Sequence, residues 1–155
     1  MTELSRENNI KDQLLVKFKF LGDKIVVKRD RRISADVDLL NFREVFSYLV
    51  NDMGFLRICM ITGFDEGENF AAKYHLTDDK GIVFDLKTYI PKTNPVIKTV
   101  SDIISGGLLY ERELVDMFGI KVEGLPEGER YPLPDGWPEG QYPLRKDWNK
   151  DMLKD

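Results

Sequence analysis

The chain has 155 residues, of which 42% are apolar, and a formal net charge of −4. That length suffices for one domain with its own core, and the acidic balance argues against a nucleic-acid-binding face, which needs clustered lysine and arginine to displace counterions from phosphates. A single cysteine, Cys59, excludes an intrachain disulfide and a Cys-x-x-Cys metal site, and a single histidine, His75, excludes a two-histidine metal site.

No segment of the sequence is suited to cross a membrane. The longest unbroken apolar run covers only residues 58–61, whereas a spanning helix needs about 20 apolar residues. The first six residues, MTELSR, lack the basic and then apolar order of a secretion signal. We therefore expect a soluble protein in a reducing compartment.

The N-terminal part of the chain allows two interpretations. The apolar residues at 10, 14, 18 and 21 are spaced as on one face of a helix, yet those at 16, 18 and 20 alternate with lysines as in a strand. Periodicity alone does not decide between them, and a helix ending near Phe18 is the favoured interpretation. Residues 24–29 then indicate a strand, and the basic run 28–32 is interpreted as a solvated turn or strand edge.

The middle of the chain predicts one helix followed by three strands. Between Asp38 and Met53 the apolar residues follow the i, i+3, i+4 spacing of an amphipathic helix, and Gly54 provides its C-terminal end. The runs 55–61, 70–76 and 82–90, separated by acidic turns that contain glycine, predict an antiparallel meander. A helical pattern then covers about 96–118, with a break at 106–107 left open. The sequence thus predicts a two-layer α+β fold, an antiparallel sheet packed with helices and followed by an extended proline-rich tail.

The single histidine and the single cysteine receive no catalytic role. His75 falls on the polar side of the strand 70–76 and is interpreted as an ordinary surface histidine. Cys59 lies inside an apolar strand, where a free thiol usually behaves as a small hydrophobic residue.

The stretch YERELVDMFGI, residues 110–120, carries the sharpest local signal. On a helical wheel its apolar residues form one stripe, and the polar residues Arg112, Glu113 and Asp116 lie on the opposite face. Gly119 stands where a left-handed C-cap residue belongs, so we expect the helix to end there.

Glu111 falls on the flank of the apolar stripe and not on the polar face. In one interpretation it reaches solvent, while Arg112 and Asp116 form a surface ion pair worth about 0.3–0.5 kcal/mol. In the other, Glu111 is buried and paired with a cation from elsewhere, for which Arg145 and Lys146 in the stretch PLRKDW are the candidates.

The composition changes after Gly119. Residues 120–148 contain five of the seven prolines and both tryptophans, and Pro-Glu-Gly followed closely by Tyr-Pro-Leu occurs twice. Proline fixes φ and lacks the backbone N–H, so this segment cannot enter the interior of a sheet. We therefore divide the chain into a domain at 1–119 and an extended strap at 120–155.

Two interpretations of the strap remain open. It either wraps over its own domain or presents Trp137, Tyr142 and Leu144 as anchors to another protein, because aromatic residues framed by proline bind with little loss of entropy. In the second case each Pro-Glu-Gly forms a turn and each Tyr-Pro-Leu supplies an anchor. We then expect the amides from Glu123 to Trp148 to exchange quickly in the isolated protein and slowly in a complex.

These motifs resemble the C subunit of the respiratory NADH dehydrogenase (complex I) and its relatives in membrane-bound, energy-converting nickel–iron hydrogenases. The resemblance spans residues 24–148 and rests mainly on YERELVDMFGI followed at short range by PLRKDW, with TGFD at 62–65, YHL at 74–76 and PKTNPVI at 91–97 in similar positions. Complex I members usually carry a Gly-His-Pro-Asp run and two arginines after this helix. Here the run is GLPE at 124–127 and only Arg130 remains, and LPDGWPEGQYPLR looks more like the hydrogenase branch.

The resemblance implies a non-catalytic structural subunit that has no cofactor of its own. It implies partners in a large catalytic subunit and a small iron–sulfur subunit, with the iron–sulfur clusters and the nickel–iron centre in those partners. It further implies a peripheral place on the cytoplasmic side of the cell membrane, with no membrane span and no nucleic acid. The residues expected to form or support the interface are Glu111, Arg112, Glu113, Asp116, Trp137, Tyr142, Leu144, Arg145, Lys146 and Asp147.

Other functions are also open at this point. Within the same class, the alternative is the C subunit of NADH:quinone oxidoreductase or of a related quinone or methanophenazine reductase. A small acid–base enzyme would need Glu111, Glu113, Asp116 and His75 to converge on one pocket, and the helical wheel separates Glu111 from Glu113. A third possibility is a stand-alone binding module whose tail recognises a peptide or protein.

Overall fold

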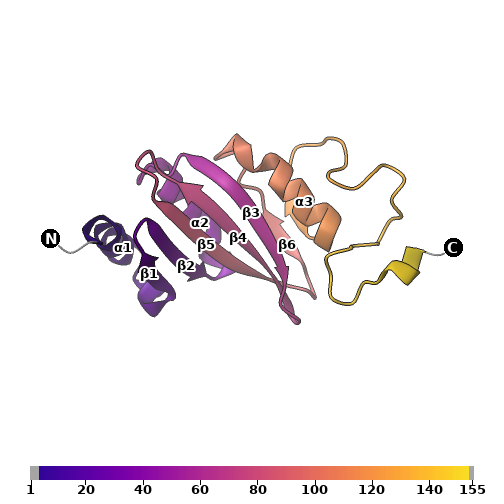
Figure 1. Cartoon of the computed structure of the whole chain (residues 1–155), viewed down its shortest axis with the longest axis horizontal. Helices are drawn as coiled ribbons and strands as arrows, with labels where there is room; N and C mark the ends of the chain where they lie inside the picture. Colours follow the sequence, from indigo (N-terminus) through magenta and orange to yellow (C-terminus); the bar gives the residue numbers. More distant parts are fainter. Residues whose placement is uncertain (1–3, 154–155) are drawn as a thin grey trace.

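The computed structural model describes residues 4–153. In chain order its elements are α1 (Ser5–Lys17), the 3-10 helix η1 (Lys19–Lys24), β1 (Ile25–Arg29), β2 (Arg32–Val37), α2 (Leu39–Asn51), β3 (Arg57–Asp65), β4 (Asn69–Thr77), β5 (Val83–Pro91), β6 (Val96–Lys98), η2 (Ser105–Gly107), α3 (Leu108–Phe118), β7 (Lys121–Glu123) and η3 (Lys150–Leu153). Figure 1 shows a central sheet with α1 at one end, α3 beside β3, and the C-terminal segment extending from the other end.

Five strands form one sheet in the order β1-β2-β5-β4-β3. β3, β4 and β5 are the predicted antiparallel meander, and β1 pairs antiparallel with β2, but β2 and β5 are parallel. The parallel pair arises because the chain crosses over through α2 and two further strands before β5 returns beside β2. The predicted α+β fold with helices packed on a sheet is confirmed, and its sheet is mixed where the sequence predicted antiparallel pairing throughout.

The core lies between the sheet and α2, which Figure 1 shows behind the strands. Side chains of β4 and β5 alternate between this face and the other, as strand geometry requires. The inward ones are fully buried: Phe70, Ala72, Tyr74, Leu76, Phe84, Leu86 and Ile90. From α2, the rings of Phe42 and Phe46 have their centroids 4.7 and 5.6 Å from that of Tyr74. The predicted α2 helix and its apolar face are therefore confirmed.

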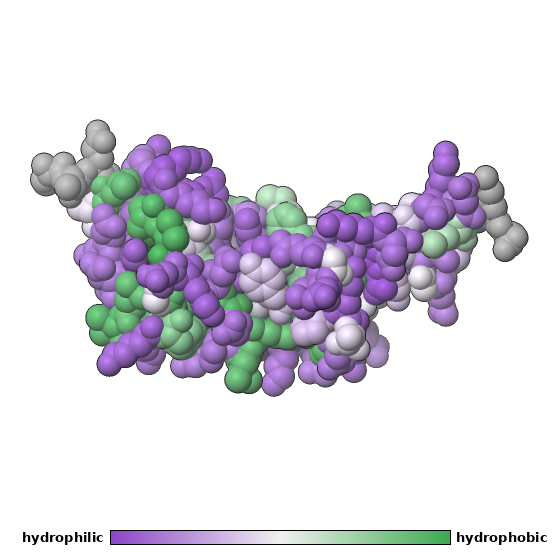
Figure 2. Space-filling view, turned by 90° about the horizontal axis from the view of Figure 1, so that it is seen from below, coloured by the Kyte–Doolittle hydropathy of each residue, from purple (hydrophilic) through white to green (hydrophobic). Residues whose placement is uncertain are grey.

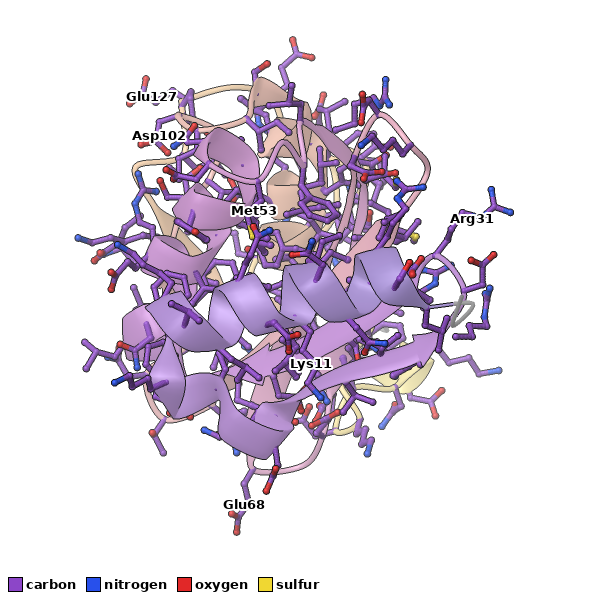
Figure 3. All side chains as sticks on the ribbon, turned by 90° about the vertical axis from the view of Figure 1, so that its left-hand side faces the viewer. Lys11, Arg31, Met53, Glu68, Asp102 and Glu127 are labelled. Atoms are coloured by element: carbon purple, nitrogen blue, oxygen red, sulfur yellow. The ribbon has the colours of Figure 1, made fainter. Side chains whose placement is uncertain are left out.

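The N-terminal segment is a helix, as favoured, and ends at Lys17 just before the buried Phe18. Figure 3 shows α1 crossing the end of the molecule and Arg31 projecting away from the turn between β1 and β2, as expected for the basic run. Strand β2 was not predicted, although Ile33, Ala35 and Val37 alternate as its buried face. On the face drawn in Figure 2, hydrophobic residues gather mainly at this end of the molecule.

The predicted helix from residue 96 is wrong in its first half. Val96 to Lys98 form β6, which pairs in parallel with β7, and α3 begins only at Leu108, after the two glycines of η2. The apolar residues at 96 and 97 belong to a strand whose partner comes later in the chain. Local periodicity does not reveal such a pairing.

The chain becomes extended after β7. Ile120 and Val122 are still buried in the core, whereas no residue from Gly124 to Leu153 is buried. We call residues 124–153 the arm. The division of the chain after Gly119 stays a prediction.

Candidate functional site: helix α3 and the arm

Helix α3 presents three faces, not the two that the helical wheel suggested. Glu111, Leu114 and Phe118 are buried in the core. Arg112 and Asp116 face the arm and hydrogen-bond to it. A third face carries Leu109, Glu113 and Met117 at successive i+4 positions, and none of these three is fully buried.

The end of α3 is as predicted. Gly119 is left-handed, with φ 70° and ψ 28°, and its N–H donates to the carbonyls of Leu114 and Val115. Ile120, which is 1% exposed, provides the buried apolar residue that accompanies such a cap.

Glu111 is buried, but its partners differ from those predicted. Its side chain is 0% exposed, and its carboxylate accepts hydrogen bonds from the Thr99 hydroxyl at 2.5 Å and from the Val100 amide at 2.8 Å. Neither Arg145 nor Lys146 contacts it, so the predicted pairing with a cation of the PLRKDW stretch is wrong. Burial raises the pKa of Glu111, and the two hydrogen bonds only partly oppose that rise.

Arg112 and Asp116 do not pair with each other, contrary to the surface-pair interpretation, because both bind the arm. The Arg112 guanidinium donates to the carbonyls of Pro126, Glu127 and Glu129 at 2.9–3.2 Å. A Cβ atom at Gly128 would overlap the guanidinium group, so a larger residue at this position would displace Arg112 from these carbonyls.

Asp116 holds the arm one helical turn further along. Its carboxylate accepts from Arg130 Nε and from the Leu133 amide, both at 3.1 Å, and it is only 7% exposed. Arg130 also donates to the Trp137 carbonyl at 2.7 Å. Side chains of α3 thus fix the path of the first half of the arm.

The PLRKDW stretch closes the C-terminal end of α3. Arg145 donates through Nε to the Phe118 carbonyl at 2.6 Å, and its guanidinium carbon lies 5.0 Å from the ring centroid of Phe70 and 4.4 Å from that of Tyr142. The Leu144 amide donates to the Met117 carbonyl at 3.1 Å. A cation near the last carbonyls of a helix interacts favourably with its dipole, and stacking on aromatic rings adds to this.

Asp65, which the sequence did not single out, joins the arm to the sheet. Its side chain is 2% exposed, forms an ion pair with Lys92 at 2.6 Å, and accepts from the amides of Lys146 and Gly67 at 2.9 and 3.0 Å. Burial opposes the charge, but these partners outweigh it and lower the pKa of Asp65 to about 2.

We therefore expect Asp65 to stabilise the protein in a pH-dependent way. Because its folded pKa lies below the ordinary value of 3.8, its contribution is complete above pH 3.8 and is lost as the pH falls towards 2. Asp65→Asn should lower the melting temperature at pH 7, and its difference from the wild type should shrink between pH 4 and pH 2. Asp135→Asn, a change at an exposed arm position, serves as control; an Asp65→Asn deficit that stayed constant with pH would contradict the assignment.

The two copies of the repeated phrase have different surroundings. Pro138-Glu139-Gly140 forms a turn with Gly140 at φ 75°, whereas the carbonyls of the first copy surround Arg112. The indole nitrogens of Trp137 and Trp148 both donate to Gln141, at 2.8 Å each, and their ring centroids are 6.1 Å apart. The second copy is thus a compact turn with a tryptophan on each side.

The remaining predicted interface residues lie on the surface of the arm. Leu144 is 48% exposed, and Lys146 and Asp147 are exposed. Trp137 is half-buried against Trp148, and Tyr142 is half-buried against Arg145 and against Gly119 at the end of α3. Their role as anchors for a partner stays a prediction.

His75 and Cys59 differ from their predicted environments. His75 does lie on the face of β4 away from the core, but Nδ1 is 2.6 Å from an Asp85 carboxylate oxygen and Nε2 is 3.0 Å from the Thr62 hydroxyl, so it is not an ordinary surface residue. Cys59 is exposed and not packed as a small hydrophobic residue, because β3 is an edge strand with a bulge at this position.

The carboxylates of an acid–base site do not converge. Glu111 lies in the core, Asp116 lies against the arm, and His75 is on the other face of the sheet. Among residues 4–153 no group of three or more His, Cys, Asp or Glu side chains could hold a metal ion. In the same part of the chain no helix is long and apolar enough to cross a bilayer.

Comparison with known proteins links this site to a subunit family. A family model for the 30 Kd subunit of respiratory-chain NADH dehydrogenase matches residues 35–152, which include α3 and most of the arm. The chain is 34% identical over 120 residues to the C subunit of the F(420)H(2) dehydrogenase of Methanosarcina mazei, covering 76% of this chain and 75% of that protein. It is 45% identical over 67 residues to the beta subunit of the membrane-bound hydrogenase of Pyrococcus furiosus, covering 43% of this chain and 39% of that protein.

A solved structure matches the chain almost throughout. A chain in the structure of the membrane-bound sulfane sulfur reductase, an archaeal respiratory membrane complex, superimposes with a TM-score of 0.84 at 28% identity. The match covers 96% of this chain and 89% of that one, so it extends into the arm.

Proposed function

Since the chain belongs to the family of the 30 Kd subunit of respiratory-chain NADH dehydrogenase, we propose that it is a structural subunit of a membrane-associated redox complex of the hydrogenase type. In this proposal α3 and the arm hold the large catalytic subunit and the small iron–sulfur subunit together. The chain then lies peripherally on the cytoplasmic side of the membrane. The iron–sulfur clusters and the nickel–iron centre are in its partners, and its own residues contribute binding and orientation.

The observation that carries the proposal is the arm itself. Fixing each residue of an extended segment costs about 1–2 kcal/mol of conformational entropy, and burial of apolar side chains is the main term that offsets it. The arm orders residues 124–153, yet none of them is fully buried in this chain, and only Leu125 packs against the core. Its contacts with α3 define a path, and a second protein that covers Leu144, Tyr142 and Trp137 supplies the missing burial.

Two branches of the family are supported by different observations. The hydrogenase branch is favoured by the stretch LPDGWPEGQYPLR and by the 45% identity to a membrane-bound hydrogenase subunit. A quinone reductase of the complex I type, or a related dehydrogenase, is favoured by the longer match to an F(420)H(2) dehydrogenase subunit.

Purification of the chain from its native membranes in mild detergent tests the proposal. Co-purification of a nickel-containing large subunit and an iron–sulfur subunit supports the hydrogenase branch. A flavin-bearing NADH-oxidising subunit selects complex I instead. A chain that is recovered alone, and that turns over a substrate unaided, would refute the structural role in both branches.

A further inference from the structure

The third face of α3 is left uncovered by the arm. Leu109 is 50% exposed, and Glu113 and Met117 follow it at i+4 and i+8 on the same side of the helix. Arg112 and Asp116, on the neighbouring face, are occupied by the arm. The third face is therefore partly accessible to another molecule, although Met117 also packs against the core.

Apolar residues continue this face on both sides. The Tyr110 hydroxyl donates to the Cys59 carbonyl at 2.9 Å, which places the backbone of the exposed Cys59, in the edge strand β3, beside α3. At the other end, the hydrogen bond from the Leu144 amide to the Met117 carbonyl brings the half-exposed Leu144 next to the helix. We call the surface formed by Cys59, Leu109, Glu113, Met117 and Leu144 the flank strip; Figure 1 shows β3 and α3 side by side there.

Glu113 is the single charge of this strip. The other acidic and basic residues of α3 all have hydrogen-bond partners. Glu111 accepts from Thr99 and Val100. Arg112 donates to arm carbonyls, and Asp116 accepts from Arg130. Within residues 4–153 the Glu113 carboxylate has no hydrogen bond or ion pair. Covering a carboxylate without a partner is costly, so any protein that covers the apolar residues of the strip must supply a donor to Glu113.

We propose that the flank strip is a docking surface for a partner subunit that presents apolar side chains and one arginine or lysine, which pairs with Glu113. The inference rests on the proposed function, because the partner is a subunit of the same complex, and it adds the chemistry by which that subunit is recognised. The strip is continuous with the arm through Leu144, so one partner contacts both. A surface of anionic lipid does not fit, since the one charge of the strip is negative.

Cys59 is the only cysteine of the chain and provides a native probe of the strip. Its alkylation by a maleimide should be at least about tenfold slower in the purified complex than in the isolated protein, because a docked subunit restricts access. The control is Val26→Cys in a Cys59→Ser background, since Val26 is 45% exposed on β1 at the other edge of the sheet. The V26C thiol should react at the same rate in both states. Equal rates for Cys59 in the two states would overturn the proposal.

Charge reversal tests the role of Glu113. Glu113→Lys should leave the melting temperature unchanged and reduce the amount of partner retained about tenfold or more, and Glu113→Gln should reduce it less. Glu44→Lys, on the exposed side of α2, is the matched control and should retain the partner fully. Normal retention by Glu113→Lys would overturn the proposal. The proposal would also be overturned if the isolated protein were a dimer that Glu113→Lys converts to a monomer. The flank strip would then bind a second copy of this chain and not a different subunit.

Variants of the arm distinguish a failure of this inference from a failure of the proposed function. Arm variants at Trp137 and Tyr142, which lie outside the flank strip, that lose the partner while Glu113→Lys keeps it refute only the flank strip. Arm variants and strip variants that both keep the partner refute the proposed function as well.

Discussion

Alanine at Trp137, Tyr142 and Leu144 together should abolish recovery of the partner subunits with this chain. Truncation of an aromatic or apolar anchor at the centre of an interface typically costs about 2 kcal/mol or more, so three such changes, if their effects add, lower the affinity by about ten-thousandfold or more. The measurement is the amount of large and small subunit retained on the tagged chain after detergent extraction.

The matched control for the arm variant is Leu40→Ala. Leu40 is 92% exposed at the start of α2, so its removal tests whether loss of any exposed apolar residue weakens assembly. The melting temperature of the isolated triple variant should fall only slightly, because Trp137 and Tyr142 are half-buried and Leu144 is exposed. Full recovery of partners by the triple variant would contradict the assignment of anchors.

Glu111→Ala should lower the free energy of unfolding by about 2–4 kcal/mol. The change leaves the buried Val100 amide without its acceptor and opens a cavity where a fully buried side chain stood. Glu111→Gln should be tolerated, since its amide oxygen can accept from Val100 and its nitrogen can donate to the Thr99 hydroxyl. Urea denaturation at pH 7 of the wild type and both variants measures the difference, with Glu44→Ala as the exposed control.

Glu111 and Asp65 should affect the free energy of unfolding with opposite pH dependence. Burial raises the pKa of Glu111 above its ordinary value of 4.5, so the native state binds the proton more readily than the unfolded state. The wild type should therefore lose stability relative to Glu111→Gln as the pH rises from 4.5 through the raised pKa. A wild type that gained stability relative to Glu111→Gln over this range would contradict the burial argument.

The fold was predictable for segments in which the spacing of apolar residues marks the buried face of a single helix or strand. The spacing of Phe42, Val45, Phe46 and Leu49 sufficed to place α2, and the alternation along residues 82–90 sufficed to place β5. Periodicity failed for β6, whose partner is β7, and it did not reveal that β2 pairs in parallel with β5. Both features depend on pairing between distant segments, for which a single sequence carries no local signal.

The structure brings helix α3 and the arm together, but their contacts were only partly anticipated from the sequence. The helical wheel identified Glu111 as an unusual carboxylate, yet it could not show that the loop at Thr99 and Val100 brings two donors to it. Arg112 and Asp116 were interpreted as an i, i+4 ion pair because a helical wheel shows only the residues of one helix. Their actual partners are in the arm.

Some residues of the site carry no signal in the sequence. Asp65 and Phe70 meet Lys146 and Arg145 only after the strands fold and the arm returns across them. Arg130 was noted only as the remainder of an arginine pair in the family resemblance, and its contact with Asp116 gives it a role in fixing the arm. Cys59 was placed in an apolar strand correctly, but the position of β3 at the edge of the sheet determines that it is exposed.

Hydrogen exchange of the arm tests most directly whether a partner holds it. Amides from Glu123 to Trp148 should exchange at least about tenfold faster in the isolated protein than in the purified complex, because no arm residue is fully buried in the isolated chain. Amides of β5, the middle strand of the sheet, should be protected equally in both states. Equal protection of the arm in the isolated protein and in the complex would mean that the arm is held by its own domain, and it would contradict the proposed function.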